Sequence, residues 1–218
     1  MNSDALEFID ELRAKRAARC GAAPPPRADA AYTVFAVDAS GSMEDSDFPP
    51  TRYLAGVDAV ENFLAMRARL GADDCFSALV FNEDAKVICE AVMLDEIQKR
   101  LLRVLRRHVP GGGTDIGAAL RAAGDLFLAI SQDYGRRLIL LSDGHGGRPY
   151  DEAEQLKHQG VIIDTIGIGG TPAEVDESCL KTIASMVGGR RRYRFITDKD
   201  DLISHFKNIA HDLVEVRT

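Results

Sequence analysis

The sequence predicts an α/β fold: a doubly wound, mostly parallel sheet with helices on both faces and one short antiparallel edge strand. Short apolar runs alternate along the chain with segments whose apolar residues recur at helical spacing. Most of these runs are apolar throughout, which is typical of parallel strands covered on both faces. One pair of runs is joined by a tight turn, which indicates a hairpin with its second strand at an antiparallel edge.

The strands are expected where β-branched, aromatic and other apolar residues run together. Residues 31–37 (AYTVFAV) form the first such run and residues 75–81 (CFSALVF) the second. The turn Asn82-Glu-Asp-Ala85 then leads into a short strand, residues 86–89. Further strands are predicted at residues 137–141, 161–168 and 193–196.

Helices are predicted between these strands. Residues 52–70 carry Leu54, Val57, Val60 and Phe63 at helical spacing. The other predicted helices are residues 94–107, 114–130, 150–159, 174–187 and 199–214. Sheets of this kind bind ligands beyond the carboxyl ends of their strands, so we expect a site in the loops after residues 37, 141 and 168.

The chain of 218 residues is expected to form one main domain, residues 31–218, preceded by an N-terminal segment, residues 1–30. Within that segment residues 3–19 are predicted to be helical, with a stripe of Ala5, Phe8, Ile9, Leu12 and Arg16. Gly21–Pro26 (GAAPPP) then ends the helix and forms a semi-rigid linker. The apolar stripe must be buried somewhere, either on the main domain or on a partner.

Composition excludes several classes of protein. Lys and Arg number 27 against 34 Asp and Glu, a net charge of −7, so nucleic acid is not the expected partner. The four cysteines (Cys20, Cys75, Cys89 and Cys179) form no C-x-x-C pair, which argues against a zinc ribbon and favours thiols in a reducing compartment. We find neither a signal peptide nor an apolar run long enough to cross a membrane, so no membrane partner and a cytoplasmic location are expected.

Three loops carry the residues that could perform chemistry. The first predicted strand ends in Asp38-Ala-Ser40-Gly-Ser42, and the strand 137–141 ends in Ser-Asp143-Gly. Thr114 follows a run of three glycines before a predicted helix. Carboxylate and hydroxyl oxygens are hard ligands that suit Mg2+, with Mn2+ as an alternative, and do not suit zinc or copper. An incompletely filled coordination shell would attract a further anionic oxygen.

At these residues the chain resembles the von Willebrand factor A-type domain family, whose fold is Rossmann-like. Asp38-Ala-Ser40-Gly-Ser42 matches the D-x-S-x-S signature of its metal-ion-dependent adhesion site, while Thr114 and Asp143 match the distant threonine and the second aspartate. The resemblance covers about residues 31–214. It implies that Ser40, Ser42 and, in some states, Thr114 ligate magnesium, and that Asp38 and Asp143 act directly or through water.

The resemblance also implies a non-enzymatic role. A partner protein would complete the metal shell with a glutamate or aspartate, and the resemblance implies a setting in an AAA-type ATPase or another multiprotein assembly. Glu44, Asp45 and Asp47 follow the first motif and should make the rim of the site negative, so the partner is expected to surround its acidic residue with Lys or Arg.

The sequence gives less support to two other functions. A metal-dependent phosphatase or hydrolase on a similar sheet would need a second carboxylate two residues after the first aspartate, where this chain has Ser40. Nucleotide binding lacks its motifs: no P-loop occurs, and the glycine-rich Gly167–Pro172 ends in proline where the dinucleotide fingerprint needs a glycine or alanine.

Overall fold

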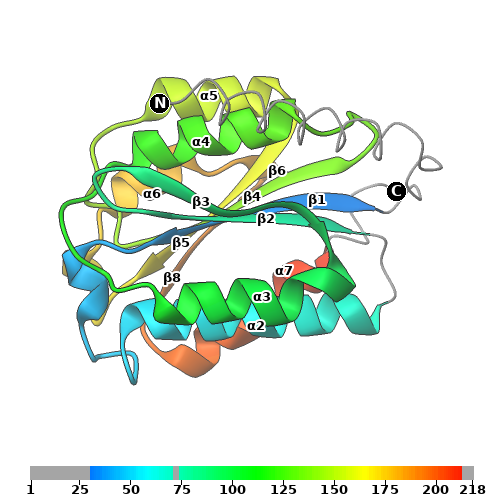
Figure 1. Cartoon of the computed structure of the whole chain (residues 1–218). Coiled ribbons are helices and arrows are strands. Elements are labelled where there is room, and N and C mark those ends of the chain that lie inside the picture. Colours follow the sequence, from blue (N-terminus) through cyan, green and yellow to red (C-terminus); the bar gives the residue numbers. More distant parts are fainter. Residues whose placement is uncertain (1–29, 71–73, 213–218) are drawn as a thin grey trace, which may run out of the picture.

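The computed structural model describes residues 30–70 and 74–212, and for residues 94–100 it describes the backbone alone (Figure 1). The predicted helix 3–19, its linker and Cys20 lie outside the described residues. Within the described ranges, no helix is both long enough and apolar enough to cross a membrane.

The centre of the fold is a six-stranded sheet in the order β3-β2-β1-β4-β5-β8. All neighbouring pairs are parallel except β2 and β3, so the expected doubly wound sheet with an antiparallel edge is confirmed. The strands are β1 (Ala31–Asp38), β2 (Cys75–Phe81), β3 (Ala85–Met93), β4 (Gly135–Ser142), β5 (Val161–Ile168) and β8 (Tyr193–Ile196).

Helices cover both faces of the sheet (Figure 1). One face carries α2 (Arg52–Arg69), α3 (Leu94–Arg107) and α7 (Lys199–Asp212); the other carries α4 (Ile116–Leu128), α5 (Tyr150–His158) and α6 (Glu177–Ile183). Successive β1 residues alternate between the two layers: Phe35 and Val37 pack with α2, whereas Val34 and Ala36 pack with α4. This alternation explains why β1 is buried along its whole length.

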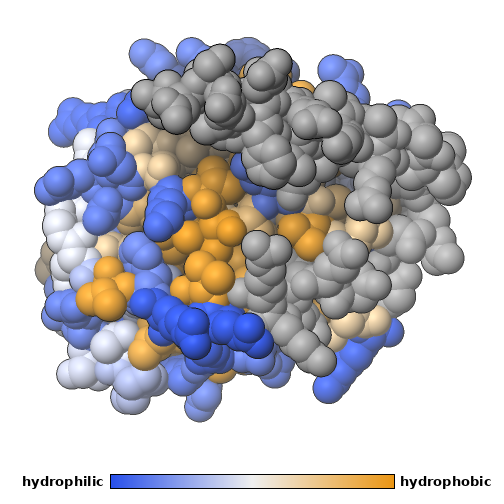
Figure 2. All heavy atoms as spheres, in the orientation of Figure 1, coloured by the Kyte–Doolittle hydropathy of each residue, from blue (hydrophilic) through white to orange (hydrophobic). Residues whose placement is uncertain are grey.

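The edge strand β3 has nine residues, more than the short strand expected at 86–89, and none of them is fully buried. Val87 packs against the α4 layer, and Ile88 and Val92 against the α2 layer. In the view of Figure 2, apolar surface is concentrated across the middle of the molecule, between the more polar outer faces of the helices.

Two predicted helices differ from the observed ones. The expected helix 174–187 is replaced by a 3-10 turn at Pro172–Glu174, the short helix α6 and the strand β6 (Met186–Val187), which pairs with β7 (Arg190–Arg191). Asp176 caps α6 by accepting a hydrogen bond from Cys179 N. The predicted helix 114–130 is shortened to α4, since Asp115 caps it and accepts a hydrogen bond from Ala118 N.

A buried ion pair joins the ends of several elements away from the carboxyl ends of the strands. Arg67, on α2, donates to Asp74 through Nε (2.5 Å) and Nη2 (3.0 Å), and both side chains are fully buried. Asp74 also accepts a hydrogen bond from Ala31 N, at the start of β1, and Arg67 Nη1 donates to Ala210 O, near the end of α7. Every described polar group of the pair is therefore partnered, as a buried pair requires.

The order of the strands positions the site. From β1 the chain continues to β2 and β3 on one side, and then returns to β4 on the other side of β1. The direction of winding thus reverses between β1 and β4, and ligands of doubly wound sheets bind in the crevice at such a reversal. Asp38 ends β1 and Asp143 directly follows β4, so these two carboxylates lie at that crevice.

Candidate metal centre

The loop after β1 is folded around the carboxylate of Asp38. This residue is fully buried; its Oδ1 accepts a hydrogen bond from Ser40 N (2.8 Å), and its Oδ2 accepts one from the Ser142 hydroxyl (2.6 Å). The loop then enters a turn of 3-10 helix, Gly41–Glu44, in which Met43 is buried in the core. Asp38 and Met43 thus anchor the loop in the protein interior, whereas Ser42, which lies between them in the sequence, is exposed.

The second carboxylate, Asp143, faces this loop. Its Oδ2 accepts a hydrogen bond from the Ser42 hydroxyl (2.5 Å), and the Ser42 and Ser40 hydroxyl oxygens lie 3.3 Å apart. Its Oδ1 accepts a hydrogen bond from His145 N at 3.2 Å. Four of the five residues identified from the sequence, Asp38, Ser40, Ser42 and Asp143, are thus linked by short polar contacts.

Thr114 comes from a third loop that is attached to the first one. Gly41 N donates to Gly112 O (3.1 Å), and Gly111 N donates to Ala39 O (2.8 Å). Thr114 is half-buried, and among the described residues its hydroxyl makes no hydrogen bond to the other four candidates. Because Asp115 caps α4, the Thr114 hydroxyl is not used for capping.

A glycine allows the loop after β4 to approach Thr114. Ile116 N donates to Gly146 O (3.2 Å), and a Cβ added at Gly146 would lie 2.8 Å from Thr114 Cγ2. Real Cβ atoms do not approach other heavy atoms this closely, so a larger residue would push the two loops apart. The loops that carry Ser42, Thr114 and Asp143 therefore form one backbone-linked unit.

The electrostatics of this unit favour a cation. Burial raises the pKa of the Asp38 carboxyl to about 6; hydrogen bonds from Ser142 and Ser40 oppose this shift, and the nearby Asp143 adds to it. The charged form of Asp38 is thus disfavoured by burial and by a like charge, and a bound cation would relieve both effects.

The rim is less negative than the sequence indicates, because it contains a buried arginine. Arg52, at the start of α2, is 4% exposed, and its Nη2 lies 2.7 Å from Asp47 Oδ2 and 2.6 Å from Glu174 Oε2. A third carboxylate, Asp45, is 3.6 Å away. The guanidinium partly neutralises these acids, while Glu44 remains exposed.

The donors fit a hard cation that keeps part of its water shell. Across residues 30–70, 74–93 and 101–212, no group of three or more His, Cys, Asp and Glu side chains could hold a metal ion. The candidate centre offers two carboxylates instead, together with hydroxyl oxygens. Mg2+ binds through one or two carboxylates and retains several waters, whereas the nitrogen and sulfur ligands that zinc and copper prefer are absent from these five residues.

Sequence reasoning missed two residues that position the site. Ser142 donates to Asp38 and accepts from Gly144 N (2.9 Å), so it holds both carboxylate loops; its place directly before Asp143 is the signal that could have identified it. Arg52 carried no such signal, because a charged residue on a predicted helix is expected to face solvent. His145, two residues after Asp143, is exposed, and its Nε2 lies 3.0 Å from Glu174 O.

Comparison with known proteins gives relatives in sequence and in structure. The chain is 29% identical to the bovine (Bos taurus) calcium-activated chloride channel regulator 1 over 75% of its own length, but it spans only 17% of that relative. In structure it is similar to a von Willebrand factor type A protein from Catenulispora acidiphila (TM-score 0.64, 23% identity, 84% of this chain and 42% of that one). It is also similar to the pilus adhesin SpaC from Lactobacillus rhamnosus GG (TM-score 0.72, 17% identity, 85% and 30%).

A family model identifies the chain more directly. The model of the von Willebrand factor type A domain matches residues 33–145, just over half of the chain. The matched range includes Asp38, Ser40, Ser42, Thr114 and Asp143. The fold of the structural neighbours agrees with this match. The chain belongs to the von Willebrand factor type A domain family.

Proposed function

We propose that this chain is a Mg2+-dependent protein-binding domain of the adaptor type, whose metal is completed by a glutamate or aspartate of a partner protein. Asp38, Ser40, Ser42 and Asp143 would hold the cation, and Thr114 would join them in some states. The observation that carries the proposal is the cluster of oxygens beside the buried Asp38: the Ser42 hydroxyl donates to the Asp143 carboxylate and lies 3.3 Å from the Ser40 hydroxyl. Mn2+ is an alternative occupant of the same oxygen ligands.

Each residue has a distinct part in this proposal. Asp38 lies deepest and orients the loop through Ser40 N, while Ser42 is exposed and can meet an incoming ligand. Asp143 supplies negative charge from the other side of the crevice. The bound cation would offer a coordination position to an acidic side chain of the partner. Without the cation, the neutral serine hydroxyls would offer that side chain only hydrogen bonds.

The rim gives the partner a second requirement. Glu44 is exposed, and the three acids around Arg52 exceed its single positive charge. An acidic residue that approaches the cation therefore passes negative groups. A partner with Lys or Arg around that acidic residue would complement the rim and approach faster at low salt. We propose that the chain acts in the cytoplasm, within a multiprotein assembly such as one built on an AAA-type ATPase.

A non-enzymatic role agrees with the chemistry of the five residues. A hydrolase needs a nucleophile or a general base with a partner that orients it. Within the part of the chain that the structure describes, neither hydroxyl of the first loop hydrogen-bonds to a histidine or lysine: Ser42 donates to Asp143, and Ser40 lies against Ser42. The carboxylates are placed to hold a cation and a loop rather than to transfer a proton to a substrate.

Calorimetric titration of the full chain with Mg2+ tests the metal part of the proposal. We expect a saturable heat of binding that is lost in Asp143→Ala and kept in Asp125→Ala, which removes an exposed carboxylate from α4. A pulldown from native cell extract, with Mg2+ or with EDTA, tests the partner. Absence of Mg2+ binding in the unmodified chain, or capture of the same partner in EDTA, would contradict the proposal.

A further inference from the structure

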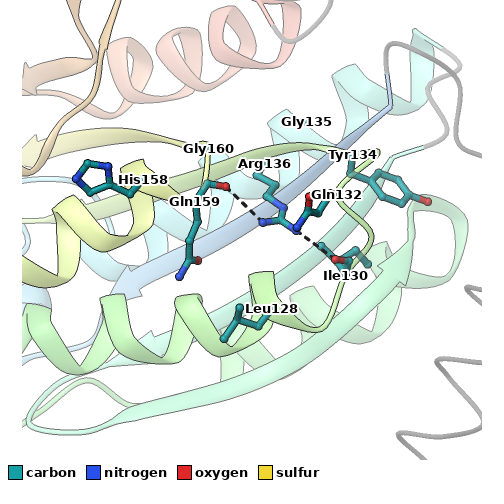
Figure 3. Close-up of a pocket in the computed structure, with 9 residues that line it drawn as sticks. All are labelled: Leu128, Ile130, Gln132, Tyr134, Gly135, Arg136, His158, Gln159 and Gly160. Atoms are coloured by element: carbon teal, nitrogen blue, oxygen red, sulfur yellow. Dashed lines mark hydrogen bonds between the residues drawn. The ribbon is translucent and has the colours of Figure 1, made fainter.

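A groove lies at the opposite end of the sheet from the candidate metal centre. It has a volume of about 470 Å³ and lies between the end of α4, the start of β4 and the turn between α5 and β5 (Figure 3). Gly135, the first residue of β4, and Gly160, which precedes β5, both line it. The groove therefore opens at the amino ends of the strands, whereas Asp38 and Asp143 lie at the carboxyl ends.

One wall of the groove is apolar and accessible. Leu128, at the end of α4, is 70% exposed, although leucine is among the residues most often buried in proteins. Ile130 and the half-buried Tyr134 continue this wall. Covering Leu128 would remove apolar surface from water, which is favourable in proportion to the area covered.

The floor of the groove is cationic. Arg136 extends between the two walls, and its guanidinium donates to Gln159 O (3.4 Å) and Ile130 O (3.3 Å) (Figure 3). Its Nε is buried without a hydrogen-bond partner among the described residues. His158 adds a second basic side chain to the lining. An acidic, apolar segment would complement both parts of this surface.

The chain itself enters the described structure beside this groove. Gly135 N donates to Ala30 O (3.1 Å), and Ala31 pairs with Gly135 in the sheet. The 29 residues before Ala30 therefore lead away from a point at the edge of the groove. The ten residues 20–29, at about 3.3 Å per extended residue, are long enough to let residues 3–19 turn back onto it.

We propose that residues 3–19 of the same chain dock in this groove. The predicted helical stripe of Phe8, Ile9 and Leu12 would cover Leu128, and the acidic residues that begin the segment would lie near Arg136. Asp4, Glu7, Asp10 and Glu11 precede all the basic residues of the segment, so the negative charge is concentrated at one end. In this proposal the apolar stripe of residues 3–19 is buried on the main domain and not on a partner.

Limited trypsin digestion of the full chain tests the proposal, with cleavage after Arg13 followed by mass spectrometry. Cleavage under native conditions tracks the population of the undocked segment when docking is fast. We expect Leu128→Ser and Phe8→Ser each to increase the cleavage rate by about tenfold, as loss of one buried apolar contact predicts. Met186→Ser is the matched control, because Met186 is also exposed (56%) but lies on β6, outside the groove.

The outcomes distinguish the possible occupants. Faster cleavage in the two variants but not in the control, with wild-type protection independent of protein concentration, supports docking within one chain. Protection that disappears on dilution overturns the proposal in favour of a second copy. Equal cleavage rates in wild type, Leu128→Ser and Phe8→Ser also overturn it, because the segment then has no contact with the groove.

Discussion

Ser42 donates a hydrogen bond of 2.5 Å to Asp143, although the two residues are 101 positions apart in the sequence. They meet because β1 and β4 are parallel neighbours, with Val37 paired to Leu141 near the end of each strand. The loops that follow the two strands therefore leave the sheet at the same edge. The arrangement of the candidate metal centre is a consequence of strand pairing, and its predicted properties can be tested one at a time.

Metal binding should stabilise the folded domain. A cation that binds only the folded state adds about 2.7 kcal/mol at a concentration 100 times its Kd. Each kcal/mol is worth roughly 2–4 °C in melting temperature for a domain of this size. We expect Mg2+ or Mn2+ to raise the melting temperature by several degrees, EDTA to reverse the rise, and Asp38→Ala to abolish it. Asp125→Ala is the control, and an unchanged response in Asp38→Ala would place the metal elsewhere.

Thr114 and Asp143 should have separable roles. Thr114→Ala removes an uncharged donor and leaves both carboxylates and both serines, so Mg2+ affinity should change little while partner binding weakens. Asp143→Ala removes charge and the acceptor of the Ser42 hydrogen bond, so it should impair both. Calorimetric titration of Mg2+, beside a pulldown of the partner, measures the two effects. Equal losses of metal affinity would make Thr114 one more metal ligand.

Catalysis should be absent. We expect no hydrolysis of phosphate esters or nucleotides by the purified chain with Mg2+, because Asp143 would be occupied by the cation and, among the described residues, neither the Ser40 nor the Ser42 hydroxyl hydrogen-bonds to a histidine or lysine. Release of phosphate is the measurement. Turnover that persists through purification and disappears in both Ser40→Ala and Asp143→Ala would favour the hydrolase alternative.

His205 should make stability depend on pH. Burial lowers the pKa of His205 to about 4; Arg194 and Arg137 add to this shift, and Asp201 and Asp212 oppose it. The unfolded chain binds a proton near pH 6.5 that the folded chain does not, so stability should fall as pH decreases from about 6.5 to 4. The contribution of this residue is of order 1–3 kcal/mol.

Substitution isolates this contribution from that of other titrating groups, including Asp38. Urea unfolding of wild type and His205→Gln across this pH range should show a smaller loss of stability in the variant. His211→Gln, at an exposed position of the same helix, should retain the wild-type slope. Parallel pH profiles for wild type and His205→Gln would be inconsistent with a half-buried His205 that stays neutral in the folded chain.

The Arg67–Asp74 pair should be sensitive to removal of one partner. Arg67→Met leaves the Asp74 carboxylate buried without its cation, which typically costs about 3–5 kcal/mol. The double variant Arg67→Met with Asp74→Asn leaves no buried charge and keeps an acceptor for Ala31 N, so it should recover part of the loss. Chemical denaturation measures both; a double variant less stable than Arg67→Met would contradict this explanation.

Much of the fold could be predicted because its signals are local. The apolar runs identify the strands, and motif residues such as Asp38 and Asp143 follow those runs directly. The hairpin of β6 and β7 was missed because strands of two residues have no periodicity to detect. The role of Arg52 depends on Glu174, which is 122 positions away, and no local pattern encodes that contact.

The Arg67–Asp74 pair has a mechanical consequence for the domain. Through it, Ala31 N at the start of β1 and Ala210 O near the end of α7 are attached to the same two side chains. The loops of Asp38 and Asp143 lie at the opposite end of the sheet, beyond the carboxyl ends of β1 and β4. A force that pulled Ala31 and Ala210 apart would therefore act on this ion pair, at the end of the sheet away from the two carboxylate loops.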